Sequence, residues 1–495
     1  MIFRPDPTRF QMGDHWLYQE QDLAHLFYMK RDVDRRFNRV GHATSADLLR
    51  WEEHDDITIH PREGDWDYQN RATQTGYVVE HEGRYWMAYG SRDVLTQKIG
   101  WLVSDDLFQW HRLSAKPAMW PQTEYYVDDG QEPVEYGFWW RDPCFIPTDK
   151  GWDAFVCARA NQEPPGGRGC IGRARSRDLL HWEYLPPIYA PRRYRGMEVP
   201  HYFELNGFHY FLFSTMSRKG IRLNSPKAQM TAGVYYCVSE SYEGPYQVPT
   251  DHLLVGRNAY VGRHFQFRGE DIFTHLNQRE HDDPGDRPTF ALPKRFGQSP
   301  DGSLFLRFWP GSEVLWDTND QELLSGKIET MGLPGEWEVG PTSVIGHCGY
   351  GPSVAWITDS YRDFHLTFNV ELTNGCRGSV LLRRDADSGV IFTINCSERQ
   401  FEIGTADGVN NGIYLHLVDT IPFSALPQLA PDFESRQFSV RLIVRQEIVD
   451  VFVMDQLIFT KSFSQIPENG PIGFATDTGG ISVVNLVLNP IDKQI

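Results

Sequence analysis

The stretch VGHATSADLLRW at Val40–Trp51 decides how most of this chain is expected to fold, because it recurs farther along. Ile99–Trp110 reads IGWLVSDDLFQW and Ile171–Trp182 reads IGRARSRDLLHW, so all three share the pattern G-x-x-x-S-x-D-L-x-x-W. A degenerate fourth copy, GVYYCVSESYEGPY, begins at Gly233. The glycines of the four copies, at positions 41, 100, 172 and 233, lie 59, 72 and 61 residues apart. Such a period indicates one structural unit that is used several times.

Each copy begins as an alternating strand, turns at its Ser and Asp, and ends on a Trp that can cap a hydrophobic layer. Further strand-like runs lie between the copies, and sustained helical periodicity is nearly absent; these runs are His25–Met29, Arg84–Tyr89, Trp152–Ala158 and Phe208–Phe213. Several short strands in each repeated unit are typical of a β-propeller. Ser303–Trp309 (SLFLRFW) is expected to supply an inner strand for a fifth unit, so five blades fit the length.

The repeated Ser, Asp and Trp residues are interpreted as scaffold. Asp and Ser close turns by bonding backbone amides, and Trp is expected to pack between blades. Residues that carry chemistry are therefore sought among polar side chains that the repeat does not explain.

From about Gln321 the pattern changes to long alternating strands. They include Asp363–Leu372, Ser379–Leu382, Gly389–Asn395, Gln437–Leu442 and Ile448–Met454. Turn signals such as Asn374-Gly375 and Gly479-Gly480 separate many of these runs, which is typical of an antiparallel sandwich. We therefore predict an all-β chain with a five-bladed β-propeller at residues 1–325 and a C-terminal β-sandwich at residues 326–495.

Length and composition restrict the function classes. A chain of 495 residues exceeds one ordinary core, and its formal net charge of −18 disfavours nucleic acid and anionic membranes as partners. No apolar run reaches transmembrane length, and the N-terminus lacks the features of a signal peptide. The seven cysteines show no zinc-binding spacing. The expectation is a cytoplasmic protein with a small-molecule or oligosaccharide substrate, and homo-oligomerisation stays open.

Three carboxylates lie next to strands but outside the repeat. Asp14 is in QMGDHWLYQ, Asp142 is in FWWRDPCFI and Glu198 is in RGMEVPHYFEL. Each precedes an apolar strand in the same phase of its own blade, so a propeller would bring them to the mouth of its central channel. Glycoside hydrolysis needs one carboxyl as acid/base and another as nucleophile or base. The other interpretation is structural, since Asp before Pro commonly opens a turn and Glu at a strand end is commonly solvated.

Several other polar and aromatic residues are candidates for contacts with a sugar. Strand alternation is expected to turn Trp140 inward, and the polar residues of the last blade suggest a channel wall. Each of these side chains could equally serve packing or turns. The candidates are Trp66, Gln69, Thr75, Trp140, Arg141, Arg263 and His264.

The order of these motifs resembles glycoside hydrolase family 32, the β-fructosidases and fructosyltransferases, in a five-bladed propeller superfamily shared with families 43 and 68. Arg141-Asp142-Pro143 reproduces the RDP signature of the family, and Glu198 occupies the place of its Glu-Cys acid/base motif. Asp14, followed by LYQEQDLAHLFYM, matches its nucleophile-bearing first strand. Farther on, Phe438–Phe452 with Gly470-Pro471-Ile472-Gly473-Phe474 resembles its C-terminal sandwich.

The resemblance implies a role for each carboxylate. Asp14 would attack the anomeric carbon, and Glu198 would protonate the leaving oxygen and then activate the acceptor. Asp142 would bind ring hydroxyls most tightly in the transition state. Arg141 could pair with Glu198 or Asp142 and tune their ionisation. Retention would require Asp14 and Glu198 to lie roughly 5–5.5 Å apart. No metal ion or organic cofactor is required.

The chain also departs from the family pattern. The Asn that precedes the nucleophile is lost in Gln11–Trp16 (QMGDHW), and Val199 replaces the Cys after the acid/base. The substrate need not be an ordinary sucrose- or inulin-type fructoside, and hydrolysis versus transfer stays open. Two alternatives remain: a family 43-like inverting arabinofuranosidase or xylosidase, and a non-catalytic sugar-binding propeller.

Overall fold

The structure is a computed structural model. It describes residues 2–32, 37–68, 73–92, 97–127, 139–215, 232–249, 252–256, 258–278, 288–316, 329–332, 335–349, 351–357, 360–373, 376–383, 388–409, 412–426, 436–463 and 467–491. The contacts divide the chain into two compact units, Ile2–Leu304 and Phe305–Ile495. The predicted boundary after residue 325 lies outside the described residues and stays a prediction.

The first unit contains five small antiparallel sheets in chain order. Blade one pairs β1 (Phe10–Glu20), β2 (Leu23–Asp32), β3 (Phe37–Ser45) and β4 (Glu52–Glu53), with β5 (Ile57–Thr58) also on β3. Blade two pairs β6 (Gln74–His81), β7 (Arg84–Arg92), β8 (Gln97–Ser104) and β9 (His111–Arg112). Blade three pairs β10 (Arg141–Thr148), β11 (Gly151–Arg159), β12 (Gly169–Ser176) and β13 (Trp182–Tyr189). Blade four pairs β14 (Glu198–Leu205), β15 (Phe208–Thr215), β16 (Gly233–Ser239) and β17 (Leu253–Gly256). Blade five pairs β18 (Ala259–Phe267), β19 (Glu270–Asn277) and β21 (Lys294–Gln298), with β20 (Thr289–Phe290) also on β19.

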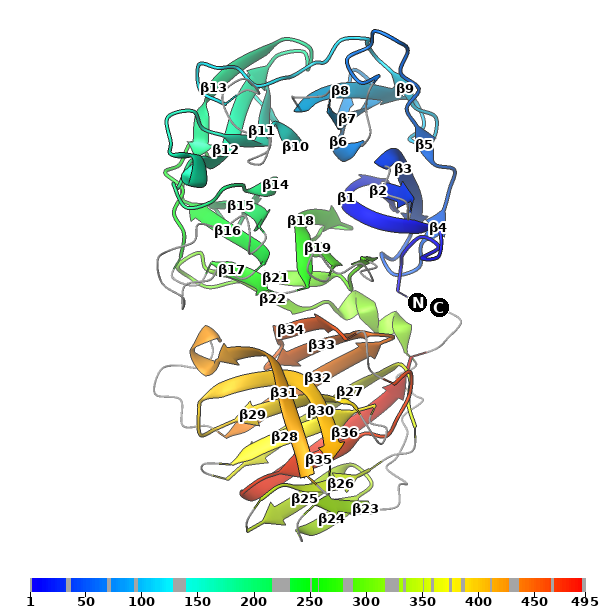
Figure 1. The fold of residues 1–495 in the computed structure, drawn as a ribbon, viewed down its shortest axis with the longest axis vertical. Coiled ribbons are helices and arrows are strands. Elements are labelled where there is room, and N and C mark those ends of the chain that lie inside the picture. Colours follow the sequence, from blue (N-terminus) through cyan, green and yellow to red (C-terminus); the bar gives the residue numbers. More distant parts are fainter. Residues whose placement is uncertain are drawn as a thin grey trace. The chain divides into compact units, whose positions relative to one another are not determined.

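The five sheets are arranged radially, with β1, β6, β10, β14 and β18 nearest the centre (Figure 1). This arrangement confirms the predicted five-bladed propeller. The expectation for Ser303–Trp309 is wrong, because β22 (Leu304–Phe308) pairs with β34 (Gln456–Ser462) and the inner strand of blade five is β18. Alternating polarity identifies a strand but does not specify its neighbour, which is why the sequence pattern was misleading here.

The repeated Ser-Asp-Trp pattern builds the same turn in three blades. In blade two, the Asp106 carboxylate accepts hydrogen bonds from the backbone amides of Phe108 (2.8 Å) and Gln109 (2.7 Å). The indole of Trp110 donates to the carbonyl of Leu107 at 2.8 Å, and Leu107 has a φ of 65°. The copies in blades one and three make the same contacts. The scaffold interpretation of the repeat is therefore confirmed.

The repeated Trp residues pack in two different ways. The ring of Trp110 lies 6.0 Å from Phe27 of blade one, and that of Trp51 lies 5.4 Å from Phe290 of blade five. Both therefore bridge neighbouring blades, as predicted. Trp182 instead contacts Phe145 of its own blade, at 5.7 Å.

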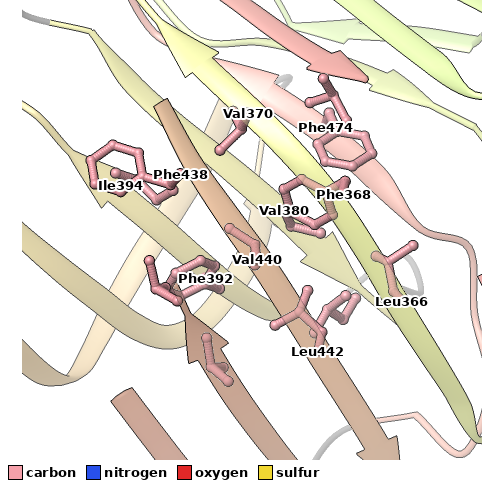
Figure 2. Packing of buried hydrophobic residues seen from close by; sticks show 14 of the residues in the cluster. Leu366, Phe368, Val370, Val380, Phe392, Ile394, Phe438, Val440, Leu442 and Phe474 are labelled. Atoms are coloured by element: carbon pink, nitrogen blue, oxygen red, sulfur yellow. The ribbon is translucent and has the colours of Figure 1, made fainter. Parts of the chain in front are cut away.

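The second unit is a sandwich of two antiparallel sheets, as predicted. One sheet has the order β34, β33 (Ile448–Val453), β32 (Gln437–Arg445), β27 (Phe364–Leu372), β36 (Gly479–Pro490), β25 (Ser343–Cys348) and β24 (Glu336–Gly340). The other has the order β23 (Glu329–Gly332), β26 (Ser353–Trp356), β35 (Gly473–Thr476), β28 (Arg377–Leu382), β29 (Val390–Asn395), β30 (Gln400–Val409) and β31 (Gly412–Pro422). Alternate residues of both sheets form the core, including Phe368, Val440 and Phe392 (Figure 2).

The helices of the described residues are three short 3-10 turns at Pro165–Gly167, Pro310–Leu315 and Phe423–Ala425. Among all the described residues, no helix has the length and apolar character that crossing a bilayer requires.

Candidate active site at the centre of the propeller

All five innermost strands carry a β-bulge in the same register. At each bulge, two residues of the inner strand face one residue of the second strand, which re-aims the inner side chains. The bulged pairs are Gly13-Asp14, Thr75-Gly76, Asp142-Pro143, Val199-Pro200 and Val261-Gly262. Asp142, Val199 and Val261 have φ values of 56°, 52° and 55°, a left-handed conformation that costs energy in residues other than Gly. Strained backbone thus recurs at one level of the channel.

The three predicted carboxylates all lie at these bulges, but in different positions. Glu198 comes directly before its bulge, Asp142 is the first bulged residue of its strand, and Asp14 is the second of its own. We predicted that the three carboxylates occupy the same position in their blades. That prediction is wrong, because their positions relative to the bulge differ by one or two residues. Strand alternation cannot anticipate this, because a bulge inserts an extra residue and changes which way the next side chains point.

Glu198 is 8% exposed and has two strong donors. Arg141 of blade three forms an ion pair with it, and the Tyr260 hydroxyl of blade five donates to its other oxygen. The remaining nitrogens of Arg141 contact Asp142 Oδ2 (Nε, 3.4 Å) and the Gln97 side-chain oxygen (Nη1, 3.2 Å). Burial lowers the pKa of Arg141, but the charges of Glu198 and Asp142 outweigh burial and raise it. Arg141 therefore stays a cation.

Asp14 has a weaker set of partners. The Thr75 hydroxyl donates to its Oδ2 at 2.5 Å. Burial, together with the nearby carboxylates of Asp142 and Glu198, raises the pKa of Asp14 to about 7, although Thr75 and Arg263 act in the opposite direction. A carboxyl in this range can change its protonation state near neutral pH.

Asp142 links the other two carboxylates. It is 2% exposed, and its Oδ2 accepts a hydrogen bond from the Val199 backbone amide at 3.1 Å. Burial raises its pKa, and the Glu198 charge adds to this, while Arg141 partly offsets both. The charges of Asp142 and Glu198 raise the pKa of Asp14, and the charge of Glu198 raises that of Asp142, so the three carboxylates form one interacting group.

Arg263 is the first residue after the bulge of β18. It is 2% exposed, its Nε donates to the His15 carbonyl at 2.6 Å, and its Nη1 is 3.4 Å from His201 Nδ1. Burial lowers the pKa of Arg263, and it also lowers the pKa of His15. Arg263 thus holds the backbone directly after Asp14 and supplies a cation next to it.

The other predicted sugar contacts lie elsewhere. Trp140 has no accessible surface and packs against Tyr126 at 4.9 Å, so the expectation that it lines the sugar site is wrong. Its hydrophobic ring is more stable between strands than in a polar channel. Trp66 packs against Tyr89 at 5.5 Å, and His264 bonds Asp271 at 2.7 Å. Gln69 lies outside the described residues.

Sequence reasoning missed three residues of this site: Tyr260, Gln97 and Gln74. Tyr260 and Gln74 occupy the position before the bulge, as Glu198 does, so an alignment of the five inner strands would have found them. Gln97 begins β8 and has no sequence signal of its own. Within the described ranges, no group of three or more His, Cys, Asp or Glu side chains is arranged to hold a metal ion.

Comparison with known proteins agrees with this geometry. The model of the glycosyl hydrolases family 32 N-terminal domain matches residues 16–271, which include Asp142 and Glu198 and begin just after Asp14. No curated protein matches the chain.

Solved structures show the same fold along nearly the whole chain. A Bombyx mori β-fructofuranosidase is 15% identical with a TM-score of 0.66, covering 98% of this chain and 94% of that one. A Lactobacillus gasseri sucrose-6-phosphate hydrolase is 15% identical with a TM-score of 0.67, covering 99% and 94%. An Aspergillus awamori exo-inulinase is 13% identical with a TM-score of 0.67, covering 99% and 96%. Because the family model covers more than half of the sequence, the chain belongs to glycosyl hydrolase family 32.

Proposed function

We propose that this glycosidase is a retaining hydrolase or transglycosylase of fructofuranosides, with a covalent glycosyl-enzyme on Asp14 and Glu198 as acid/base. The observation that carries the proposal is the interacting group of three carboxylates at the bulges of the inner strands. The fructoside part rests on family membership and on the similar structures, which are named as a β-fructofuranosidase, a sucrose-6-phosphate hydrolase and an exo-inulinase.

The reaction has two steps in this proposal. Ionised Asp14 attacks the anomeric carbon while Glu198 gives its proton to the leaving oxygen. Glu198 then takes a proton from water or an acceptor hydroxyl, which attacks the same carbon and releases Asp14. Asp142 accepts hydrogen bonds from ring hydroxyls and stabilises the positive charge of the transition state.

The contacts around Asp14 and Glu198 favour the opposite proton distribution from the one that catalysis needs. The pKa of Asp14 is raised to about 7, whereas Glu198 has Arg141 and Tyr260 as donors that favour its ionised form. Catalysis needs Asp14 ionised and Glu198 protonated. Sugar hydroxyls that donate to Asp14 and Asp142 would stabilise their charges, so substrate binding is expected to move the proton toward Glu198.

The first test is a product screen on sucrose, inulin, levan, difructose anhydrides and arabinofuranosides, with Asp14→Asn as the inactive control. Turnover of a fructoside by the wild type alone is the expected result. Turnover of arabinofuranosides without any fructoside would contradict the substrate proposal.

The second test determines stereochemistry in methanol–water mixtures with the best substrate. A methyl fructofuranoside does not mutarotate, so NMR can read its anomeric configuration directly. We expect methyl β-fructofuranoside from a β-linked substrate, because two successive displacements retain configuration. The α-anomer as first product would show inversion and exclude a glycosyl-enzyme on Asp14.

A further inference from the structure

Gln97 is a buried amide that joins the second and third blades beside the carboxylates. Its side chain is enclosed, with the residue 4% exposed at the start of β8. Its oxygen accepts a hydrogen bond from Arg141 Nη1 at 3.2 Å, and its nitrogen donates to Gln74 Oε1 at 2.9 Å. A buried amide with an unmet donor or acceptor costs free energy, and here both ends are bonded.

The direction of this hydrogen-bond chain follows from Arg141. A guanidinium has donors only, so the atom of Gln97 that faces it must be the oxygen. The nitrogen of Gln97 therefore faces Gln74, which must present its own oxygen. One cation thus sets the orientation of two amides, and the chain leads from Gln74 through Gln97 and Arg141 to Glu198.

The neighbours of Arg141 restrict different movements of its guanidinium. The ring of Trp139 lies 4.4 Å from the guanidinium carbon, so stacking fixes the plane of the group. Stacking leaves rotation within that plane free. Gln97 restricts this rotation by holding Nη1, which directs Nη2 to Glu198. Without Gln97, the guanidinium could turn its fork to Asp142, whose Oδ2 is already 3.4 Å from Nε.

We propose that Gln97 is a positioning residue for Glu198, acting through Arg141 by holding the guanidinium against the acid/base carboxylate. This inference rests on the proposed function, in which Glu198 protonates the leaving group. Gln97 itself need not touch the substrate.

The test compares Gln97→Met with wild type on two substrates. Sucrose has a poor leaving group that needs acid assistance, whereas nitrophenyl β-fructofuranoside has a good one that needs little. We expect Gln97→Met to lower kcat/KM for sucrose by about tenfold or more, with a loss below about threefold for the nitrophenyl substrate, because only proton donation is impaired.

Gln97→Glu tests the charge. The new Glu side chain keeps an oxygen for Arg141. It also places a further carboxylate on the same guanidinium that pairs with Glu198. Like charge raises the pKa of Glu198, so the alkaline limb of kcat/KM should move to higher pH. A purely structural role would not move this limb.

The matched control is Gln298→Met, which removes another bridging amide of the propeller. Gln298 donates to the Leu205 carbonyl at 3.1 Å and accepts from Asn206 at 2.8 Å, at the opposite end of β14 from Glu198. We expect equal effects on both substrates and an unchanged alkaline limb. If the Gln97 variants behave like this control, the inference is wrong while the proposed function stands. If the wild type turns over no fructoside of the product screen, the proposed function fails and the inference fails with it.

Discussion

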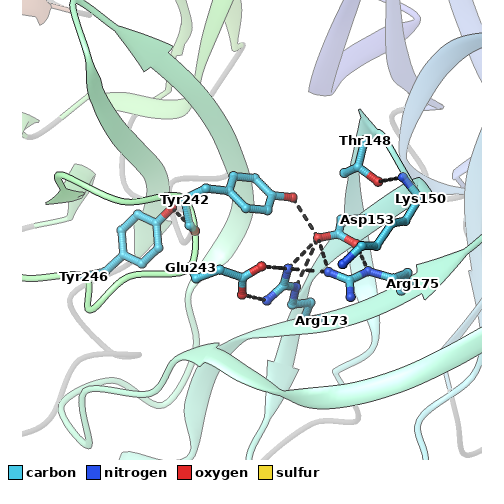
Figure 3. A network of polar contacts seen from close by, with 8 residues as sticks. All are labelled: Thr148, Lys150, Asp153, Arg173, Arg175, Tyr242, Glu243 and Tyr246. Atoms are coloured by element: carbon cyan, nitrogen blue, oxygen red, sulfur yellow. Dashed lines mark hydrogen bonds and ion pairs between the residues drawn. The ribbon is translucent and has the colours of Figure 1, made fainter.

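Two buried carboxylates of the propeller, Asp153 and Asp14, show opposite electrostatic behaviour. Asp153 on β11 has no accessible surface and accepts hydrogen bonds from Arg173 (2.6 Å), Arg175 (2.8 Å) and Tyr242 (2.8 Å), as Figure 3 shows. Burial alone would raise the pKa of Asp153, but these donors outweigh burial and lower it. Among the described residues, Asp14 has one side-chain donor and two carboxylate neighbours, and its pKa is raised to about 7.

The two sets of donors suit different roles for the two carboxylates. Asp153 joins β11 and β12 of blade three to the segment after β16 of blade four, where Tyr242 and Glu243 lie. A structural link is most stable when the charge is always present and fully paired. Among the described residues, Asp14 accepts one side-chain hydrogen bond. Ionising it therefore costs free energy, and its pKa lies near neutral pH. In the proposed mechanism, the same kind of side chain is scaffold in one place and reactive in the other, according to its donors.

The largest expected effect is on kcat, which substitution of Asp14 should lower and substitution of Asp153 should not. Asp14→Asn removes the proposed nucleophile, so we expect kcat to fall by more than about a thousandfold. Asp153→Asn should keep nearly wild-type kcat per folded molecule. Steady-state kinetics, normalised to the folded fraction by circular dichroism, measure both. Comparable losses in the two variants would contradict the division into reactive and structural carboxylates.

The second effect concerns stability. Asp153→Ala leaves the buried Arg173 with the exposed Glu243 as its remaining ion-pair partner among the described residues, so we expect a loss of about 3 kcal/mol. Thermal unfolding should then show a Tm lower by roughly 6–12 °C. Asp14→Ala is the control and should lower Tm much less. An unchanged Tm for Asp153→Ala would show that the network does not join the blades.

The third effect is the pH dependence of stability. The pKa of Asp14 rises from about 3.9 in the unfolded chain to about 7 in the folded one, so the folded state binds its proton more tightly. The fold therefore loses stability as pH rises from about 4 to about 7, and that loss is absent in Asp14→Asn. We expect Asp14→Asn to raise Tm by about 3 °C at pH 8 and by less at pH 5.

Asp153→Asn gives the contrast for this measurement. Its lowered pKa contributes stability that is present above the unfolded value near 4 and is lost only as pH falls through the folded value. The Tm decrease should therefore be similar at pH 5 and pH 8. A Tm difference for Asp14→Asn that does not change with pH would show that Asp14 is not under electrostatic strain.

The smallest effect belongs to the repeated turn. Asp106 is solvent-exposed and bonds two backbone amides, so Asp106→Ala should cost about 1 kcal/mol or less. Chemical denaturation measures this loss, and kcat should not change. A larger loss than that of Asp153→Ala would reverse the ranking of the two structural carboxylates.

The predictable part of the site comes from local chemistry. Asp14, Asp142 and Glu198 could be found because they lie outside the repeat, next to strands, with family motifs around them. Thr75 was also predicted, and the structure places its hydroxyl on Asp14. Trp140 shows the limit, because alternation gave it an inward direction while packing enclosed it completely.

The sequence by itself determined the β class, the repeated turn and the sandwich, because strand alternation and Ser-Asp turn contacts act over a few residues. Only the tertiary structure decided the five aligned bulges and the pairing of β22 with β34. It also decided which donors reach each carboxylate: Arg141 and Tyr260 on Glu198, and Thr75 on Asp14. These contacts join residues about 60 positions apart on different blades, so no local pattern encodes them.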